Sequence, residues 1–480
     1  MKWQTVIGLE VHAQLNTQSK LFSASSTRYG ALPNSQVNYI DAGLPGVLPV
    51  LNQEAVYMAI QFGLAINAEI NNHSYFERKN YFYPDLPKGY QISQFKRPII
   101  GQGHLDILTN DGQTKRVLIN RAHLEEDAGK STHDNHATYT GIDLNRAGTP
   151  LLEIVTTPCL YSAEDAVTYL KTLHQLLRFL NICDGNMQEG SFRCDVNLSL
   201  RPFGAQQLGT RTELKNINSF RFIEKAIQYE QWRHQELLES GQSIIQETRL
   251  YNPDKHQTEV LRSKENENDY RYFPDPDLLP IQLLDEDIEH IKSNLPPLPS
   301  ALSKQFKEED GLSPEHIDFL LTSPSLAQFY KRVKIETTAL PKTIVNWLKG
   351  SYAAALNELG LSYDNPPVSA ATLACLLNYI DNNTLSNNNA KKVFTELLAN
   401  KRGIDEIIQE QGLTAPHDHA DLEATIIKII QQFPEQVADY RSGKEKLLGF
   451  FVGQVMKATK GQAEPSIVNS LLLKHLMVSD

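Results

Sequence analysis

Two segments in which apolar and polar residues alternate strictly constrain the fold of this chain more than any other feature. Residues 5–15 place Ile7, Leu9, Val11, Ala13 and Leu15 on one side and Glu10, His12 and Gln14 on the other. Residues 191–201 repeat the pattern, with Phe192, Cys194, Val196, Leu198 and Leu200 opposite Arg193, Asp195, Asn197, Ser199 and Arg201. A period of two predicts strands with one face in a core and one polar face, as in antiparallel sheets.

The 480 residues are enough for about three domains at the usual size. Short alternating segments broken by Gly, Pro and Asn fill the first part, and the proline run NLPPLPS at residues 294–300 can continue neither a helix nor a central strand. Helical periodicity follows, interrupted by a polar, turn-prone stretch at 411–420. We therefore predict an α+β protein with a large β-rich, antiparallel domain at 1–293, an all-helical domain at 294–410 and a small helical tail domain at 411–480.

The β-rich part also contains predicted helices. Ser162 is a candidate N-cap, and the apolar residues that follow it recur on one helix face: Ala166, Tyr169, Leu170, Leu173, Leu177 and Leu180. A second helix is predicted over residues 222–238. In the helical part, Ser313 before Pro314 is the pattern of a helix start.

Composition excludes several classes of protein. Lys and Arg number 46 against 57 Asp and Glu, a net charge of −11, so the whole surface is no polycation and we expect no binding to DNA. The four cysteines form no CxxC pair, which favours a reducing cytoplasm over a disulfide framework. We expect no membrane association, because the start of the chain does not read as a signal peptide and no apolar run approaches about 20 residues.

Polar residues of mixed charge gather on the predicted strand faces. Besides Glu10 with His12, and Arg193 with Asp195, residues 210–217 align Arg211, Glu213 and Lys215. Residues 116–127 align Arg121, His123 and Glu125 and lead into a predicted acidic turn at 125–127. Carboxylates suit Mg²⁺ bridging to substrate phosphates, and Arg193 and Lys215 would neutralise phosphate, whereas the nitrogen of His12 leans toward a transition metal.

The alternative is that each strand merely presents the solvated face of an antiparallel sheet, which is the commoner case for any single strand. The mixture of carboxylates with His and Arg argues against it, because idle faces are usually Thr, Lys, Glu and Gln. The tail carries a local cationic excess that could follow an RNA backbone, or could simply be a solvated helix face: Arg441, Lys444, Lys446, Lys457, Lys460 and Lys474 against Glu445 and Glu464.

Long ordered blocks of the chain closely resemble the B subunits of the glutamine-dependent aspartyl/glutamyl-tRNA amidotransferase, the GatB family of the GatCAB complex. The blocks are residues 7–15 (IGLEVHAQL), 43–52 (GLPGVLPVLN), 78–91 (RKNYFYPDLPKGYQ), 123–130 (HLEEDAGK), 143–153 (DLNRAGTPLLE), 191–197 (SFRCDVN), 213–216 (ELKN), 269–277 (DYRYFPDPD) and 448–459 (LGFFVGQVMKAT). The first block begins at residue 7 and the last ends at residue 459, so the resemblance extends along essentially the whole chain.

This resemblance implies a β-rich cradle, a helical domain and a tail that reaches tRNA. It implies a ligase that uses ATP and Mg²⁺ to phosphorylate the side-chain carboxylate of Glu-tRNA(Gln) or Asp-tRNA(Asn), with ammonia from glutamine then giving Gln-tRNA(Gln) or Asn-tRNA(Asn). The implied partners of this heterotrimer are the amidase A subunit, the small C subunit and the misacylated tRNA. The family's catalytic metal ligands fall on Glu10, His12, Glu125 and Glu213, and Asp195 is a further candidate at the same site. Arg193 and Lys215 are our own assignments as phosphate contacts.

The chain departs from many family members in one respect. Where those members carry four zinc-binding cysteines, it has Ser23, Ser25, Asn38 and Asp41, so we expect no zinc. Two alternatives stay open at this point. A non-catalytic tRNA-binding scaffold needs cations but no group of carboxylates, and a Mg²⁺-dependent phosphohydrolase would act without aminoacyl-tRNA.

Overall fold

The computed structural model describes residues 2–132, 139–263, 269–399, 402–413, 419–444, 446–459, 463 and 465–477. The chain divides into two compact units, Met1–Ala301 and Leu302–Asp480. The boundaries at residues 293 and 410 that the sequence suggests for three domains stay a prediction. Predictions that concern residues 414–418, Glu445, Lys460 and Glu464 lie outside the described residues.

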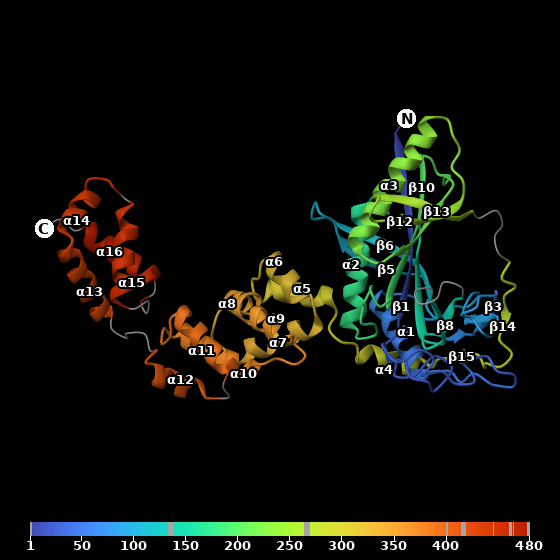
Figure 1. The fold of residues 1–480 in the computed structure, drawn as a ribbon, viewed down its shortest axis with the longest axis horizontal. Helices are drawn as coiled ribbons and strands as arrows, with labels where there is room; N and C mark the ends of the chain where they lie inside the picture. Colours follow the sequence, from blue (N-terminus) through green and yellow to red (C-terminus); the bar gives the residue numbers. More distant parts are fainter. Residues whose placement is uncertain are drawn as a thin grey trace. The chain divides into compact units, whose positions relative to one another are not determined.

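The first unit is built on a large mixed sheet (Figure 1). Within the described residues its strands lie in the order β13-β12-β11-β10-β1-β9-β6-β5. Their bounds are β1 Trp3–Gln14, β5 Gly103–Leu108, β6 Thr114–Glu126, β9 Pro150–Thr156, β10 Phe192–Pro202, β11 Thr212–Ile217, β12 Glu247–Asn252 and β13 Gln257–Ser263. Only the pairing of β11 with β12 is parallel among these described strands. The expected α+β class with an antiparallel-rich sheet is confirmed.

Among the described residues, three small sheets accompany it. One pairs β3 (Glu77–Asn80) with β4 (Tyr90–Ser93) and β14 (Phe273–Pro274). Another pairs β2 (His73–Ser74) with β15 (Ile281–Gln282), and the third pairs β7 (Lys130–Thr132) with β8 (Gly141–Asp143). Segments far apart in the sequence therefore lie side by side at β3 and β14 (Figure 1).

The alternation that the sequence predicts is present in the burial of β1 and β10. Along β1, Leu9, Val11 and Ala13 are buried while Glu10 and His12 are partly exposed. The same alternation runs along β10 from Phe192 to Leu198, after which Ser199 is buried as well. Helices α2 (Ala163–Phe179) and α3 (Phe220–Glu239) cover the apolar face, α2 packing on α3 and β5, and α3 on β10 (Figure 1). Helix α1 (Gln53–Ala65) packs on β6 and on α4 (Asp285–Ser293).

Local signals account for these helices. Ser162 is the N-cap of α2 and its hydroxyl accepts a hydrogen bond from the backbone of Asp165, as predicted. Every residue of the predicted apolar face of α2 is buried. Helix α3 begins two residues earlier than predicted, because Ser219 caps it, and it ends one residue later. The predicted acidic turn at 125–127 is wrong: strand β6 continues through Glu126, and all three carboxylates are buried.

The second unit is helical in its described part (Figure 1). Its elements, with the helix that crosses the unit boundary, are α5 Pro299–Glu308, α6 Pro314–Leu320, α7 Pro324–Glu336, α8 Pro341–Trp347, the π-helix η1 Leu348–Tyr352, α9 Ala353–Leu359, α10 Ala370–Asp381, α11 Asn387–Ala399, α12 Ile404–Gln411, α13 His419–Gln432, α14 Pro434–Arg441, α15 Leu447–Ala458 and α16 Pro465–Met477. Ser313 caps α6 with Pro314 at its first turn, as predicted. An apolar core that includes Ile426, Phe451 and Leu472 joins α13, α15 and α16.

A buried charged network fastens α3 to β12 and β13. Glu230 is fully buried and pairs with Arg233 at 2.9 Å and with Arg249 at 2.9 Å. Thr258 donates a hydrogen bond to it, and His234 lies 3.4 Å away. Burial alone would raise the pKa of Glu230, but hydrogen bonds from His234 and Arg233 outweigh it and lower the pKa to about 2.

This network predicts acid sensitivity. Because the folded pKa of Glu230 lies below its ordinary value of 4.5, the carboxylate contributes stability above pH 4.5, and this is lost as the pH falls toward 2. The full contribution is about 3 kcal/mol. Glu230→Gln should be less stable than the parent at pH 7, and the gap should narrow by roughly half between pH 6 and pH 3. Urea unfolding at several pH values measures this gap.

Exposed Glu236 on the same helix supplies the control, since Glu236→Gln should show no such pH-dependent gap. A gap for Glu230→Gln that stays constant from pH 6 to pH 3 would contradict the assignment.

Candidate active site

The register of the central strands brings the polar side chains together. In the pairing of β1 with β10, Glu10 lies opposite Asp195 and His12 opposite Arg193. Strand β9 then places Glu153 between His12 of β1 and His123 of β6. One-residue slips would carry every one of these groups to the apolar face. The polar face of the sheet is therefore a continuous row of titratable side chains that runs across several strands.

Three carboxylates from neighbouring strands form the first group, which we call the carboxylate cluster: Glu10, Asp195 and Glu213. One oxygen of each lies within 4.8 Å of the others. A β-bulge between Cys194 and Val196 accompanies this meeting of β10 and β11. Lys215 lies against the cluster, with its ammonium 2.5 Å from Asp195 and 3.1 Å from Glu213.

Neutral donors hold two of these carboxylates in place. Asn197 donates to Glu10 at 2.9 Å, and the fully buried Thr248 on β12 donates to Glu213 at 2.8 Å. Burial raises the pKa of Glu10, and so do the negative charges of Glu153, Asp195 and Glu213. A cation relieves such mutual repulsion, so the arrangement of these carboxylates could hold a metal ion or an ammonium group.

Two histidines and two carboxylates form the second group, the histidine–carboxylate cluster: His12, His123, Glu125 and Glu153. The Nε2 atom of His12 lies 3.5 Å from Glu153 and 3.8 Å from Glu125. Nε2 of His123 lies 3.3 Å from Glu153 and 3.7 Å from Glu125. Single ligand atoms of His12, Glu125 and Glu153 lie within 4.8 Å of one another, close enough to share one cation.

The electrostatics of this second cluster favour positive charge. Burial would lower the pKa of His123, but Glu153 and Glu125 raise it to about 9. The pKa of Glu153 is well below its ordinary value, because the two histidines outweigh its burial. The buried Nδ1 of His123 has no hydrogen-bond partner among the described residues. Carboxylate and imidazole donors together fit a divalent cation, with the nitrogen leaning toward a transition metal.

Further charged pairs border the two clusters. Arg193 donates to Asp127 at 3.0 Å, and Gln14 donates to the same carboxylate at 2.9 Å. Lys88 pairs with buried Glu126 at 2.5 Å. Burial alone would raise the pKa of Asp127, but the charge of Arg193 outweighs it, so the pKa is lowered. The end of β6 is thus an acidic edge whose charges are balanced by side chains from β10 and from the segment before β4.

The structure distributes the sequence-predicted site residues over both clusters. Glu10, Asp195, Glu213 and Lys215 meet in one, His12 and Glu125 meet in the other, and Arg193 lies beside Asp127. Sequence reasoning missed Glu153 as a site residue. The available signal was a lone charge within the apolar run Leu151-Leu152-Glu153-Ile154-Val155, which a buried strand tolerates only with a partner.

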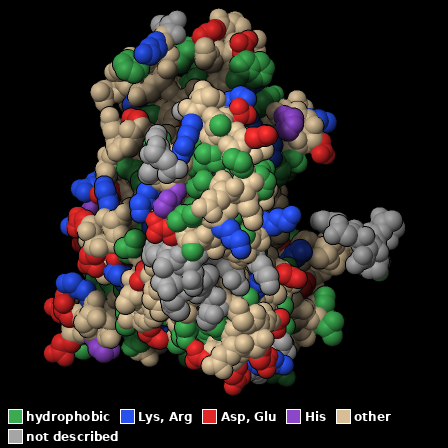
Figure 2. All heavy atoms as spheres, turned by 90° about the vertical axis from the view of Figure 1, so that its left-hand side faces the viewer, with side chains coloured by type: hydrophobic (Ala, Val, Ile, Leu, Met, Phe, Trp, Pro, Cys, Tyr) green, Lys and Arg blue, Asp and Glu red, His purple; other side chains and the backbone are tan. Residues whose placement is uncertain are grey.

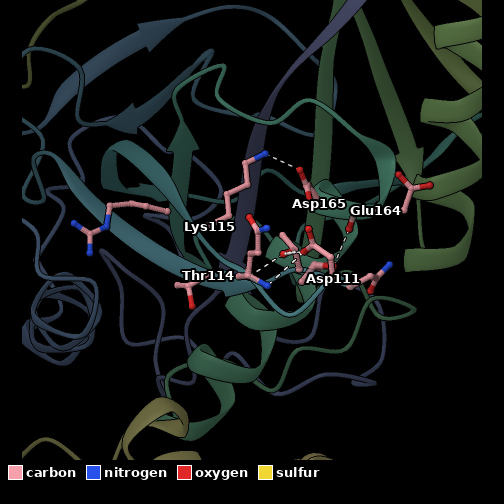
Figure 3. Close-up of a pocket in the computed structure, with 10 residues that line it drawn as sticks. Asp111, Thr114, Lys115, Glu164 and Asp165 are labelled. Carbon is pink, nitrogen blue, oxygen red and sulfur yellow. Dashed lines mark hydrogen bonds and ion pairs between the residues drawn. The ribbon is translucent and has the colours of Figure 1, made fainter.

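A cleft of about 630 Å³ lies elsewhere, between the turn of the β5–β6 hairpin and the start of α2 (Figure 3). Asp111, Lys115, Glu164 and Asp165 line it, and Lys115 pairs with Asp165 at 2.6 Å. No residue of either cluster lines this cleft among the described residues, so it is not the candidate active site.

The predicted cationic excess of the tail is partly neutralised. Lys444 pairs with Asp439 and Lys474 with Glu423, each at 2.9 Å, while Lys446 and Lys457 are exposed. Figure 2 shows basic and acidic side chains interspersed on the face that it presents. Across the part of the chain that the structure describes, no helix combines the length and apolar character needed to cross a bilayer.

The stretch in which the sequence predicts no zinc contains a buried ion pair. Lys20 is fully buried and lies 3.1 Å from Asp41, whose other oxygen accepts from Ser23 at 2.7 Å. Lys20 also donates to the carbonyls of Gln36 and Leu144. Burial lowers the pKa of Lys20 although Asp41 opposes the shift. The pair joins loops from three parts of the chain.

Comparisons with known proteins identify the class. Residues 5–289 match the model of the GatB/GatE catalytic domain, and residues 328–476 match that of the GatB domain. The B subunit of the aspartyl/glutamyl-tRNA(Asn/Gln) amidotransferase of Legionella pneumophila (strain Lens) is 64% identical over 476 residues, 99% of this chain and 100% of the relative. The corresponding protein of Coxiella burnetii (strain CbuG_Q212) is 55% identical over 477 residues, with the same coverage. The chain belongs to the GatB family, as its sequence blocks predicted.

The buried pair of Lys20 and Asp41 yields a stability prediction. Lys20→Met or Asp41→Asn should each cost about 3–5 kcal/mol, because each leaves a buried group without its partner. The double variant Lys20→Met/Asp41→Leu should lose less than the sum. Urea unfolding provides the free energies. Lys474→Met, which breaks an exposed pair, is the control and should change the free energy of unfolding far less. Equal effects of the buried and exposed changes would count against the pair.

Proposed function

We propose that this chain activates the side-chain carboxylate of Glu-tRNA(Gln) or Asp-tRNA(Asn) with ATP and Mg²⁺, within a complex that also contains an amidase A subunit and a small C subunit. Glutamine is the source of ammonia, and the products are Gln-tRNA(Gln) or Asn-tRNA(Asn). The observation that carries this proposal is the pair of adjacent clusters on one polar sheet face. A tRNA-binding scaffold has no need of several repelling carboxylates in that position.

The reaction order follows from acyl chemistry. A carboxylate oxygen attacks the γ-phosphorus of ATP, the bond to the β-phosphate oxygen breaks, and ADP leaves. The product is an acyl phosphate, in which phosphate is a good leaving group. Ammonia then forms the C–N bond, and the C–O bond to phosphate breaks. A free carboxylate does not react with ammonia in this way, because oxide or hydroxide would have to leave, and both are poor leaving groups.

The residues divide these tasks. Glu10, His12, Glu125 and Glu213 are the proposed Mg²⁺ ligands, and the geometry adds Asp195 to the first cluster and Glu153 to the second. Magnesium ion, when bound, offsets the charge that develops on the transferred phosphoryl group. Thr248 and Asn197 orient Glu213 and Glu10 through their hydrogen bonds.

Arg193 and Lys215 are the proposed phosphate contacts, although each is already in an ion pair. Lys215 shares the oxygens of Asp195 and Glu213. A metal ion competes for these same oxygens, so its binding would release the ammonium toward phosphate. Arg193 keeps Asp127 as its partner while part of its side chain remains exposed.

The division of labour along the chain is also a proposal. Residues 1–293 would form the catalytic cradle, residues 294–410 a helical domain, and residues 411–480 the tail that contacts tRNA. The complex would act in the cytoplasm. Exposed Lys446 and Lys457 are the described tail cations best suited to phosphate, because their charges lie at the surface.

Glu125→Gln tests the catalytic role. In the complex with the A and C subunits, without glutamine, the parent should release ADP in the presence of Mg²⁺ and misacylated tRNA. The variant should lose about 100-fold or more of that activity, since an electrostatic contact of the transition state is gone. Its tRNA affinity should change little, and Glu236→Gln serves as the surface control. Parallel losses of activity and tRNA binding in the variant would contradict the assignment of Glu125 to the catalytic site. If the parent complex releases no ADP, the chain is a non-catalytic tRNA-binding scaffold.

Lys446→Ser/Lys457→Ser tests the tail. Removal of phosphate contacts should weaken tRNA binding and reduce the slope of log K against log salt by about 0.7–0.9 for each phosphate that is no longer neutralised. ADP release at saturating tRNA should be retained. Filter binding at several salt concentrations measures both affinity and slope, with Lys304→Ser on α5 as the control. An unchanged affinity and slope would remove these two lysines from the RNA site.

A further inference from the structure

Among the described residues, two cations next to the histidine–carboxylate cluster form no direct ion pair. Neither Lys79 on β3 nor Arg121 on β6 has a side-chain hydrogen bond or ion pair within that part of the chain, and the Nε atom of Arg121 is buried without a partner there. Arg193 and Lys215 differ in that both form ion pairs, although Nε of Arg193 is likewise buried without a partner among the described residues. A buried unpaired donor is costly, so its retention indicates a ligand with acceptor oxygens.

A row of aromatic rings lies beneath these cations. Phe95 stacks on Tyr272 with ring centroids 4.5 Å apart and planes 13° apart. Tyr270 follows at 6.1 Å from Tyr272, and Tyr81 at 6.0 Å from Tyr270. We call these four residues the aromatic row. Phe95 is 44% exposed, and the three tyrosines are partly exposed. The row therefore offers ring surface to a planar ligand.

The two cations sit at either end of this aromatic row. The ammonium of Lys79 lies 4.9 Å from the ring centre of Tyr270 and 5.7 Å from that of Tyr81. The guanidinium of Arg121 lies 5.6 Å from the ring centre of Phe95. Cation–π contacts fix both side chains while leaving their N–H donors unused.

Strand pairing holds the aromatic row in register. Arg78 of β3 lies opposite Phe273 of β14, so the chain of Tyr270 and Tyr272 runs beside Lys79 and Tyr81. Asn80 fixes the approach, because its side-chain amide donates to the carbonyls of Tyr270 and Arg271. Residues far apart in the sequence thus form one surface.

Hydrogen bonds tie this surface to the acidic end of β6. Ser93 of β4 donates to Glu125 at 3.1 Å, and Gln91 donates to the carbonyl of Glu126 at 2.7 Å. Tyr81 donates its hydroxyl to Gln91 at 3.2 Å. Burial would lower the pKa of Lys79, but the charge of Glu125 outweighs it. Cations and rings therefore border the proposed reaction centre.

We propose that the aromatic row, with Lys79 and Arg121, binds a nucleotide, the base lying on the exposed rings and its phosphate groups contacting the cation at the nearer end of the row. Stacking on aromatic side chains together with cationic contacts to phosphate is the usual combination for single nucleotides and strand ends. This inference rests on the proposed function, which supplies two sources of one chemistry: ATP, and the 3′-terminal adenosine of the aminoacyl-tRNA.

The binding step can be tested without catalysis. Binding of Mg²⁺–ADP, and of tRNA with and without its terminal adenosine, should be measured on the complex with the A and C subunits. Each of three substitutions should lower the affinity for one of these ligands by roughly tenfold: Tyr272→Leu, Lys79→Met and Arg121→Met. Tyr272→Phe and Lys79→Arg should retain most of the affinity. Weakened ADP binding alone assigns the site to ATP. Weakened binding of intact tRNA, with no effect on the shortened tRNA, assigns it to the strand end.

Tyr161→Leu is the matched control, because Lys115 lies 4.9 Å from its ring centre in the same kind of contact outside the site. Thermal unfolding of each variant must stay close to that of the parent, and Tyr272→Phe and Lys79→Arg keep the test valid if a larger change fails to fold. Unchanged binding of ADP and of both tRNA forms in folded variants would overturn the inference. Failure of the complex to release ADP would overturn the proposed function alone, since these binding measurements need no turnover.

Discussion

The antiparallel pairing of β1 with β10 is the constraint on which the rest of the structure depends. It runs from Trp3 opposite Pro202 to Ala13 opposite Phe192, in the middle of the large sheet. Because side chains alternate along each strand, the register of this pairing determines which residues enter the core and which residues form the polar face. The apolar residues meet α2 and α3, and this burial holds the polar face in place on the other side.

Holding repelling carboxylates close together requires compensation, and the structure provides it at several levels. The single charge of Lys215 is shared by Asp195 and Glu213, the histidines lie against Glu153, and Arg193 pairs with Asp127. Neutral donors such as Thr248 fix the direction of individual oxygens. In the carboxylate cluster one lysine faces three carboxylates, so part of the negative charge stays uncompensated and the cluster can accept a further cation. Lys79 and Arg121 are different, since no described residue pairs with their charges.

Local sequence signals predicted the parts of the fold that local physics controls. The alternation of apolar and polar residues predicted which face of β1 and β10 is buried, and Ser162 and Ser313 predicted where two helices begin. Both signals depend on residues that are neighbours in the chain. Such reasoning failed at the end of β6, where three successive carboxylates predicted an acidic turn. These carboxylates are buried because they pair with side chains that are distant in sequence, such as Lys88 and Arg193. The position of Glu153 and the separation of the site residues into two clusters depend on the order of the strands and on a bulge. Neither can be read from a single segment of the sequence. The choice between paired and unpaired cations likewise needed the tertiary structure, while the family was recognisable from the blocks themselves.

The central claim is that the side-chain carboxylate of the aminoacyl-tRNA becomes an acyl phosphate before the amide forms. The most direct measurement labels that carboxylate with ¹⁸O and analyses the phosphate released during amidation by the complex with its A and C subunits. Carboxylate activation predicts one labelled oxygen in inorganic phosphate for each amide formed, because the C–O bond breaks when ammonia enters. Phosphate without label, at the same yield of amide, would contradict the account.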